Sequence, residues 1–226
     1  MLYFLDSADF SLIADTIAAF PVDGVTTNPA ILARDLPAGC SVGDGLCEIR
    51  RLTEGLLLFV QATAADADGM VRDAHAICRR LGGRISIKLP ATAAGFTAAK
   101  RLSAEGISVT MTAVYSTSQA MLAGACGADF CAPYVSHLDN LSLDGAAVAA
   151  EMARQLSLHG MKTQVLAASF RTASQVERCI AGGVTAVTIT ADMFGMLAAH
   201  PGTMTELASF DAKWNARFGG AMADLM

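Results

Sequence analysis

Short apolar runs alternate with amphipathic stretches along almost the whole chain. Runs with the character of buried strands occupy residues 2–6, 24–28, 56–63, 84–90, 107–112, 129–134, 163–169 and 186–190. Apolar residues at helical spacing fill the gaps between them, at residues 10–20, 66–81, 93–105, 116–126, 145–158, 173–181 and 191–199. Only residues 31–51 contain no helix that the pattern can place. The alternation predicts an α/β fold in which eight parallel strands close into a (β/α)8 TIM barrel.

A further helix is predicted at residues 203–218, after the barrel is complete. Its apolar residues recur at steps of three and four and form one stripe, made of Met204, Leu207, Phe210, Trp214 and Phe218. No linker or low-complexity stretch interrupts the chain, so we expect residues 1–226 to form a single barrel domain with this helix appended. The stripe either covers the barrel or docks on a neighbouring subunit, and we favour the second arrangement, a homo-oligomer.

The predicted strand at residues 84–90 carries a lysine among apolar residues. Pleat alternation places Ile85, Ile87 and Leu89 on one face and Ser86 and Lys88 on the other. Burial penalises the charged form of an amine, so this lysine is expected to lose proton affinity and to become a nucleophile near neutral pH. The strand alone also permits a structural role, in which the lysine extends from the strand end into solvent.

Polar residues end the other predicted strands as well. In a (β/α)8 barrel the chemistry lies at the carboxyl ends of the strands. The last inward-facing positions are Asp6, Asn28 with Thr26 before it, Gln61, Lys88, Thr112, Tyr134, Ser169 and Thr190. One amine, one carboxylate and one phenol among eight convergent polar ends indicate a reaction site.

This set of side chains supports a narrow range of reactions. An amine in a dry pocket is suited to attack a ketone or aldehyde, and the resulting iminium allows a neighbouring carbon–carbon bond to break or form. Asp6 and Tyr134 are the ionisable candidates for proton transfer. A water can be held between Gln61 and Thr112, while Asn28 and Ser169 offer hydrogen bonds to sugar hydroxyls.

Composition excludes several other classes of function. The chain has 226 residues, of which 53% are hydrophobic and 16% charged, as expected for a large core. A net charge of −5 without a basic run argues against a nucleic-acid partner. The six cysteines and four histidines form no metal-ligand motif, and no Gly-x-Gly-x-x-Gly segment opens a helix, so we expect neither metal nor cofactor. Without a secretory signal or an apolar run of membrane-spanning length, a cytoplasmic location and no membrane partner are expected.

Six segments carry recognisable motifs, at residues 3–8, 24–29, 87–92, 112–115, 132–135 and 166–171. Thr-Thr-Asn-Pro at residues 26–29 and Lys-Leu-Pro at residues 88–90 are highly specific in combination. On these motifs the chain resembles the small transaldolase family, most closely its bacterial fructose-6-phosphate aldolase branch. The resemblance runs in order from residue 2 to about residue 218.

The resemblance implies a metal-independent class I aldolase, an aldehyde-lyase of carbohydrate metabolism. Such an enzyme reversibly cleaves fructose 6-phosphate or a related ketose into dihydroxyacetone and an aldehyde such as glyceraldehyde 3-phosphate. Lys88 is then the Schiff-base residue, and Asp6 handles the proton of the C4 hydroxyl. Tyr134 is the acid/base residue, acting through a water held by Gln61 and Thr112. Family members of this type assemble as decamers of two pentameric rings, with the C-terminal helix reaching a neighbour.

The expected substrate-binding residues include one departure from the family. They are Thr26, Asn28, Ser169, Arg171 and His137. His137 stands where the family carries an arginine after Ala-Pro-Tyr-Val. Arginine binds phosphate bidentately and is always charged, whereas histidine is a titratable cation. His137 is therefore either a proton-dependent phosphate contact or a surface substitution, and Arg171, beside Ser169, is a second candidate for contact with an anion.

Two alternative functions remain open. A transaldolase would move the three-carbon unit between sugar phosphates, but transaldolases proper usually carry a glutamate in place of Gln61 and a phenylalanine in place of Tyr134. By resemblance, both residues favour the aldolase branch. A catalytically silent barrel that binds a ligand or organises an assembly predicts a broken set of site residues. The chain instead retains Lys88, Asp6, Tyr134 and Gln61.

Overall fold

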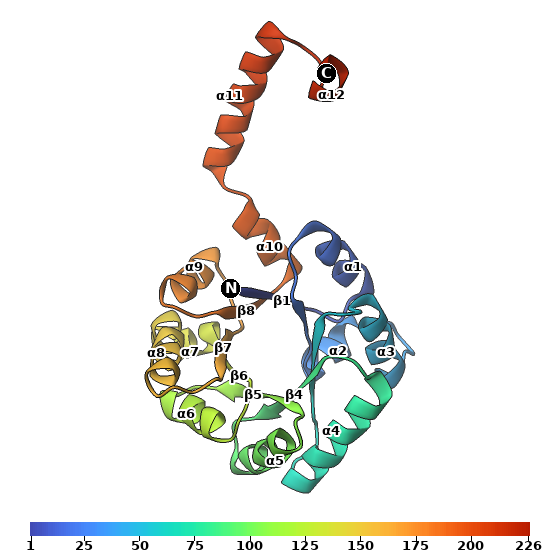
Figure 1. The fold of residues 1–226 in the computed structure, drawn as a ribbon, viewed down its shortest axis with the longest axis vertical. Coiled ribbons are helices and arrows are strands. Elements are labelled where there is room, and N and C mark those ends of the chain that lie inside the picture. Colours follow the sequence, from blue (N-terminus) through green and yellow to red (C-terminus); the bar gives the residue numbers. More distant parts are fainter. The chain divides into compact units, whose positions relative to one another are not determined.

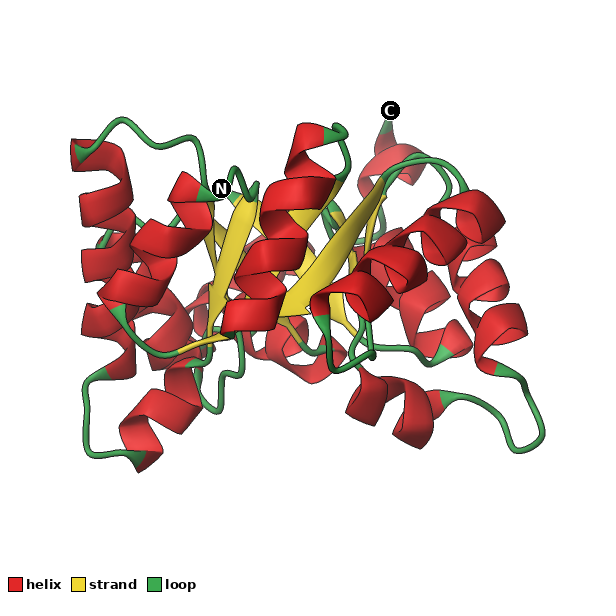
Figure 2. Cartoon of the chain, turned by 90° about the horizontal axis from the view of Figure 1, so that it is seen from below, coloured by secondary structure: helices red, strands yellow, loops and turns green.

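The computed structural model describes residues 1–226 and contains a closed barrel of parallel strands (Figure 1). The strands are β1 (Leu2–Asp6), β2 (Gly24–Thr26), β3 (Leu57–Gln61), β4 (Ile85–Pro90), β5 (Ser108–Val114), β6 (Phe130–Pro133), β7 (Gln164–Ala167) and β8 (Ala186–Ile189). Each strand pairs with the next, and β1 pairs with β8. Figure 2 shows the strands enclosed by helices. The (β/α)8 barrel predicted from the alternating pattern is therefore confirmed.

The helices follow the strands in the order expected. They are α1 (Phe10–Ala19), α2 (Pro29–Asp35), α3 (Val42–Leu52), α4 (Ala67–Leu81), α5 (Ala93–Ala104), α6 (Thr117–Ala125), α7 (Val135–Asn140), α8 (Gly145–Leu158), α9 (Ala173–Ala181), α10 (Ala191–Ala198), α11 (Pro201–Arg217) and α12 (Met222–Leu225). The stretch that the pattern leaves open, residues 31–51, contains most of α2 and α3. None of the helices is long and apolar enough to cross a membrane.

The chain divides into two compact units, Met1–Ala191 and Asp192–Met226. The first unit holds the barrel and its helices up to α9. The second contains α11, which confirms the extra helix predicted at residues 203–218 and begins two residues earlier. The single-domain organisation expected from the sequence stays a prediction.

Side-chain caps explain where many of the helices begin. Asp66 accepts the backbone N–H of Gly69 at 2.8 Å, and Thr92 accepts that of Gly95 at 3.2 Å. Such caps satisfy backbone donors that have no partner within the helix. Asn28 caps α2 in the same way, accepting the N–H of Ile31 at 2.9 Å. Asn28, which is predicted to bind substrate, therefore also fixes the start of α2, shortly after the end of β2.

Two apolar layers hold the barrel together. Outward-facing residues of the strands, such as Leu5, Val60 and Ile87, are buried against the surrounding helices. Inside the barrel, Phe4, Phe59 and Phe130 pack with Leu166 in one buried cluster. The interior is thus filled by aromatic rings toward the amino ends of the strands, which leaves the carboxyl ends available for polar side chains.

Candidate active site

Polar residues at the strand ends enclose a cavity of about 360 Å³. The predicted site residues that line this cavity, called the central cavity below, are Asp6, Thr26, Asn28, Lys88, Thr112, Tyr134, His137 and Ser169. Thr190, the last strand end identified in the sequence, lines it too. The barrel therefore brings together most of the side chains singled out from the sequence, and they come from strands, loops and the helix α7, which are far apart in the chain.

Lys88 reaches the central cavity from the middle of β4. Its side chain lies on the interior face with Ser86, whose hydroxyl is 2.8 Å from that of Thr110, as pleat alternation predicts. The residue is only 5% exposed, and Nζ donates to the carbonyl oxygen of Thr27 at 2.8 Å. Burial lowers the pKa of the Lys88 ammonium, and the opposing effect of the Asp6 carboxylate is smaller. The fraction of Lys88 in the unprotonated, nucleophilic form is accordingly higher than for a lysine in water.

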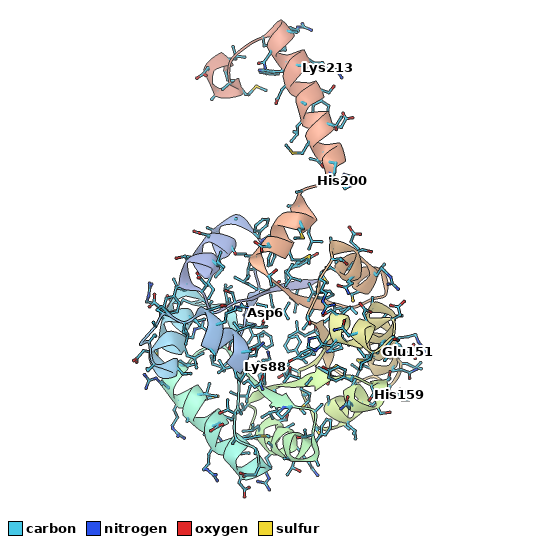
Figure 3. The ribbon with its side chains drawn as sticks, turned by 180° about the vertical axis from the view of Figure 1, so that it is seen from behind. Asp6, Lys88, Glu151, His159, His200 and Lys213 are labelled. Atoms are coloured by element: carbon cyan, nitrogen blue, oxygen red, sulfur yellow. The ribbon has the colours of Figure 1, made fainter.

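Asp6 is the acidic partner of this amine. Figure 3 shows Asp6 and Lys88 inside the barrel, whereas Glu151 and His159 lie on its outer helices. Burial raises the pKa of the Asp6 carboxyl, although Lys88 and a hydrogen bond from Thr26 act in the opposite direction. Thr26 Oγ1 donates to Asp6 Oδ1 at 2.6 Å and lies 2.5 Å from Thr188 Oγ1. A carboxylate with a raised pKa accepts a proton more readily, which suits a general base.

Tyr134 supplies the phenol and lies immediately after β6. Its hydroxyl is 2.9 Å from Thr112 Oγ1. Burial raises the pKa of Tyr134, so the phenol stays protonated at neutral pH and can donate a hydrogen bond or a proton. Thr112 occupies a β-bulge, where the pairing of β5 with β6 shifts register and Ala113 adopts a φ of +55°. The bulge is a local distortion of the kind often found beside active sites.

Ser169 and His137 form the rim on the side of β6 and β7. Ser169 has a φ of +60°, an uncommon value for a residue other than glycine, and its Oγ lies 2.8 Å from that of Ser136. His137 is exposed, and its Nδ1 is 3.1 Å from the Tyr115 hydroxyl. Its ring meets the ring of Tyr134 edge-on at 5.2 Å. These contacts hold the His137 imidazole at the mouth of the central cavity.

Two predicted residues do not line the central cavity. Gln61 is the β3 residue paired with Lys88, yet it lines a neighbouring groove next to α2, α3 and α4. Arg171 is exposed, and its Nη1 donates to Asn140 Oδ1 at 3.0 Å. The water-holding role of Gln61 and the anion-binding role of Arg171 stay predictions.

The central cavity also involves residues that sequence reasoning missed. Thr188 contacts Thr26, and strand alternation could have identified it because it precedes Thr190 by two positions. The Thr27 carbonyl that accepts from Lys88 is a backbone group and leaves no signal in the sequence. Arg34, on α2, lines the central cavity as well. It falls in the stretch whose helices the pattern could not place.

Comparison with known proteins places this arrangement in a family. The family model described as Transaldolase/Fructose-6-phosphate aldolase matches residues 3–224. The chain belongs to the transaldolase/fructose-6-phosphate aldolase family. A protein of Hyphomonas neptunium named probable transaldolase is 34% identical over 215 residues, covering 94% of this chain and 97% of that protein. A protein of Streptococcus pneumoniae named probable fructose-6-phosphate aldolase is also 34% identical over 215 residues, covering 95% and 96%. The resemblance inferred from the motifs is confirmed.

Solved structures match the fold of this family member at much lower identity. Thiamine phosphate pyrophosphorylase from Pyrococcus furiosus superposes with a TM-score of 0.59 at 14% identity, covering 84% of this chain and 85% of the other. The flavin-binding domain of baker's yeast flavocytochrome b2 superposes with a TM-score of 0.58 at 12% identity, covering 84% and 57%. At such identities the similarity shows a shared barrel and nothing about the reaction.

Proposed function

We propose that this family member is a class I aldolase that cleaves and forms a ketose through a Schiff base on Lys88. The observation that carries the proposal is the buried Lys88 amine, which shares one cavity with the Asp6 carboxyl and the Tyr134 phenol. The substrate is fructose 6-phosphate or a related ketose, and the products are dihydroxyacetone and an aldehyde such as glyceraldehyde 3-phosphate. The family membership supports this choice because relatives carry aldolase and transaldolase names.

The proposed reaction begins when Lys88 Nζ attacks the C2 carbonyl carbon of the ketose. The carbinolamine loses water and becomes an iminium, which withdraws electrons from the adjacent carbon–carbon bond. Asp6 takes the proton of the C4 hydroxyl as the C3–C4 bond breaks and the aldehyde leaves. The electron pair of that bond forms an enamine. Protonation of the enamine at C3 and addition of water at C2 then release dihydroxyacetone and restore the amine.

Tyr134 is the proposed proton carrier for the steps that involve water. Its phenol stays protonated and is 2.9 Å from the Thr112 hydroxyl, so the pair can orient a water above Lys88. In this proposal Gln61 is the second residue that holds this water. Asn28, Thr26 and Ser169 line the same cavity and offer neutral hydrogen bonds to sugar hydroxyls.

Borohydride trapping tests the covalent step directly. Reduction in the presence of dihydroxyacetone or fructose 6-phosphate is expected to leave one adduct, located on Lys88 by peptide mass spectrometry. Lys88→Ala should abolish the adduct, whereas Lys100→Ala, which removes an exposed lysine on α5, should leave it unchanged. No adduct in the native enzyme, or an adduct on another lysine, would overturn the proposed mechanism.

A transaldolase is the alternative, since the Hyphomonas neptunium relative carries that name. Both enzymes form the same enamine on the lysine, but a transaldolase passes it to a second sugar aldehyde instead of releasing dihydroxyacetone. Incubating the protein with fructose 6-phosphate alone separates the two functions. Sustained release of free dihydroxyacetone supports the aldolase, and turnover only after addition of a sugar-phosphate acceptor supports the transaldolase.

The family resemblance also leads us to propose a homo-oligomer, a decamer of two pentamers. The apolar stripe of α11 is compatible with this assembly, because Met204, Leu207, Phe210 and Phe218 are all exposed. Sedimentation velocity measures the state directly, and removal of residues 199–226 is expected to reduce the assembly to smaller species. If the truncated protein keeps the same number of subunits per particle, α11 has no role in assembly. The cytoplasmic location expected from the sequence stays a prediction.

A further inference from the structure

The central cavity is lined by a guanidinium group that was not identified from the sequence. Arg34 lines the cavity together with Lys88 and His137. It extends from the last turn of α2, the helix that follows β2, whereas His137 follows β6. In the barrel order, β2 and β6 each stand two strands from β4, which carries Lys88. The side of the cavity after β2, called the β2 wall, and the side after β6 are therefore equally far from the reactive amine in strand order. The permanent cation, Arg34, is on the β2 wall.

Arg34 is held in place by a carboxylate that is itself anchored. Its Nε donates to Asp35 Oδ1 at 2.5 Å, and its Nη2 donates to Asp35 Oδ2 at 2.9 Å. The same Asp35 Oδ2 accepts the backbone N–H of Ala8 at 3.1 Å, and the Asp35 side chain is only 10% exposed. A bidentate pair of this kind fixes the plane of the guanidinium. The anchor ties Arg34 to the segment that directly follows Asp6.

The remaining donors of Arg34 are available to a ligand. Asp35 uses Nε and Nη2, so Nη1 takes no part in the ion pair. The Arg34 side chain is 67% exposed and lines the central cavity. Its positive charge also acts on Asp6, whose carboxyl pKa it lowers against the larger effect of burial. This effect is smaller than those of burial, Lys88 and Thr26, so removal of the Arg34 charge should leave proton transfer by Asp6 largely unchanged.

We infer that Arg34 binds an anionic group, phosphate or carboxylate, on the acceptor aldehyde. This inference rests on the aldolase function proposed above and assigns the acceptor to a chemical class. Arginine binds either anion through paired N–H donors and keeps its charge at all working pH values. Arg171 is the rival cation, but it is bonded to Asn140 and does not line the central cavity. Arg34 thereby supplies a permanent cation for this contact on the β2 wall, opposite His137.

Acceptor selectivity tests this role in the complete enzyme. With dihydroxyacetone as donor, kcat/KM is measured for glyceraldehyde 3-phosphate and for glyceraldehyde. Arg34→Gln is expected to lower the value for the phosphorylated acceptor about tenfold to hundredfold, as for loss of a charge-assisted hydrogen bond, and the value for free glyceraldehyde by less than about twofold. Arg34→Lys should retain part of the preference, because it keeps the charge but loses the fork geometry.

Arg51→Gln is the matched control. Arg51 is also paired bidentately with a neighbouring carboxylate, Glu48, and its side chain is 68% exposed, against 67% for Arg34. It does not line the central cavity, so its loss should leave kcat/KM unchanged for both acceptors. Equal losses for both acceptors in Arg34→Gln, or no loss for either, would overturn the role proposed for Arg34.

Binding of unreactive analogues separates this inference from the aldolase proposal. Calorimetric titration with glycerol 3-phosphate, glycerate and glycerol compares the native protein with Arg34→Gln. If Arg34→Gln weakens the binding of glycerol 3-phosphate but not of glycerate, Arg34 binds a phosphate. If it weakens the binding of glycerate but not of glycerol 3-phosphate, Arg34 binds a carboxylate. Unchanged binding of both anions overturns the inference, even if dihydroxyacetone is trapped on Lys88. A failure of trapping would instead reject the aldolase and leave the calorimetric result as the test of Arg34.

Discussion

The two halves of the barrel interior are built from the same strands and serve opposite purposes. Toward the amino ends, Phe4 meets Phe59 at 4.9 Å between ring centroids and Phe130 at 6.0 Å, in edge-to-face contacts. Two residues further along β1 and β3, the inward positions are Asp6 and Gln61. Strand geometry keeps positions two apart on one face. A single step of the pleat therefore separates a packed aromatic layer from polar side chains.

This contrast separates stability from chemistry within one core. The aromatic layer removes large apolar surfaces from water and stabilises the barrel. At the polar end, burial disfavours the charged forms of Lys88 and Asp6, as the directions of their pKa shifts show. Residues that prepare a site for catalysis commonly reduce stability in this way. Substitutions in the two halves should accordingly affect different measurable quantities.

Replacement of Lys88 should have the largest effect, a loss of activity in a protein that keeps its fold. Lys88→Met keeps the length of the side chain but removes the amine, so no Schiff base can form. Aldol cleavage is expected to fall on the order of 10⁴-fold or more, as for removal of other covalent nucleophiles, while the circular dichroism spectrum stays native. Steady-state assay of ketose cleavage gives the measurement. Activity within tenfold of the native enzyme would show that the polar half does not work through this amine.

Removal of one ring from the aromatic layer should have the converse effect. Phe59 is fully buried, and Phe59→Ala is expected to lower the free energy of unfolding by about 3–5 kcal/mol, because it leaves a cavity among the rings. Urea unfolding measures this loss, and kcat below the unfolding transition should change by less than about threefold. Loss of activity in a protein of unchanged stability would contradict the separation of the two halves.

The sequence predicted this contrast only in part. Strand alternation and the order of elements were sufficient for the barrel and for the cavity position of Lys88, Asp6 and Tyr134, since a closed parallel barrel brings its strand ends together. Alternation could not separate Gln61 from the others, because a residue can share the register of Lys88 and still line a neighbouring groove.

The loops explain what the sequence could not predict. Arg34 lies in residues 31–51, a stretch with three glycines, one proline and two short helices, where periodicity gives no reliable orientation. The contact of Lys88 with the Thr27 carbonyl depends on backbone geometry and not on residue type. The pairing of His137, on α7, with Tyr115, directly after β5, likewise joins residues 22 positions apart. These details of the mouth depend on the folded backbone and not on sequence pattern.

The rim should accept a substitution that changes selectivity without loss of stability. His137→Arg adds a permanent cation opposite Arg34, and we expect the ratio of kcat/KM for phosphorylated over free acceptor to rise about tenfold, equivalent to about 1.4 kcal/mol. His159→Arg, at the exposed end of α8, is the control and should leave the ratio unchanged. An unaltered ratio in His137→Arg would remove position 137 from acceptor recognition.

The smallest expected effect is the dependence of stability on pH that arises from Lys88. Burial lowers the pKa of its ammonium in the folded protein, whereas the unfolded chain keeps the ordinary lysine value of about 10.4. Between these two values the unfolded chain binds more protons, so the free energy of unfolding rises with pH. The free energy of unfolding of the native protein should therefore rise relative to that of Lys88→Met from pH 8 to pH 9, by at most about 1.4 kcal/mol, the limit for one proton.

Urea unfolding at the two pH values measures this difference. Lys100→Met provides the control, because that lysine is exposed and its removal should leave the pH dependence of the native protein intact. A difference that stays flat from pH 8 to pH 9 would mean that folding does not release a proton from Lys88 in this range. Such a result would contradict the amine-based chemistry assigned to the polar half of the interior.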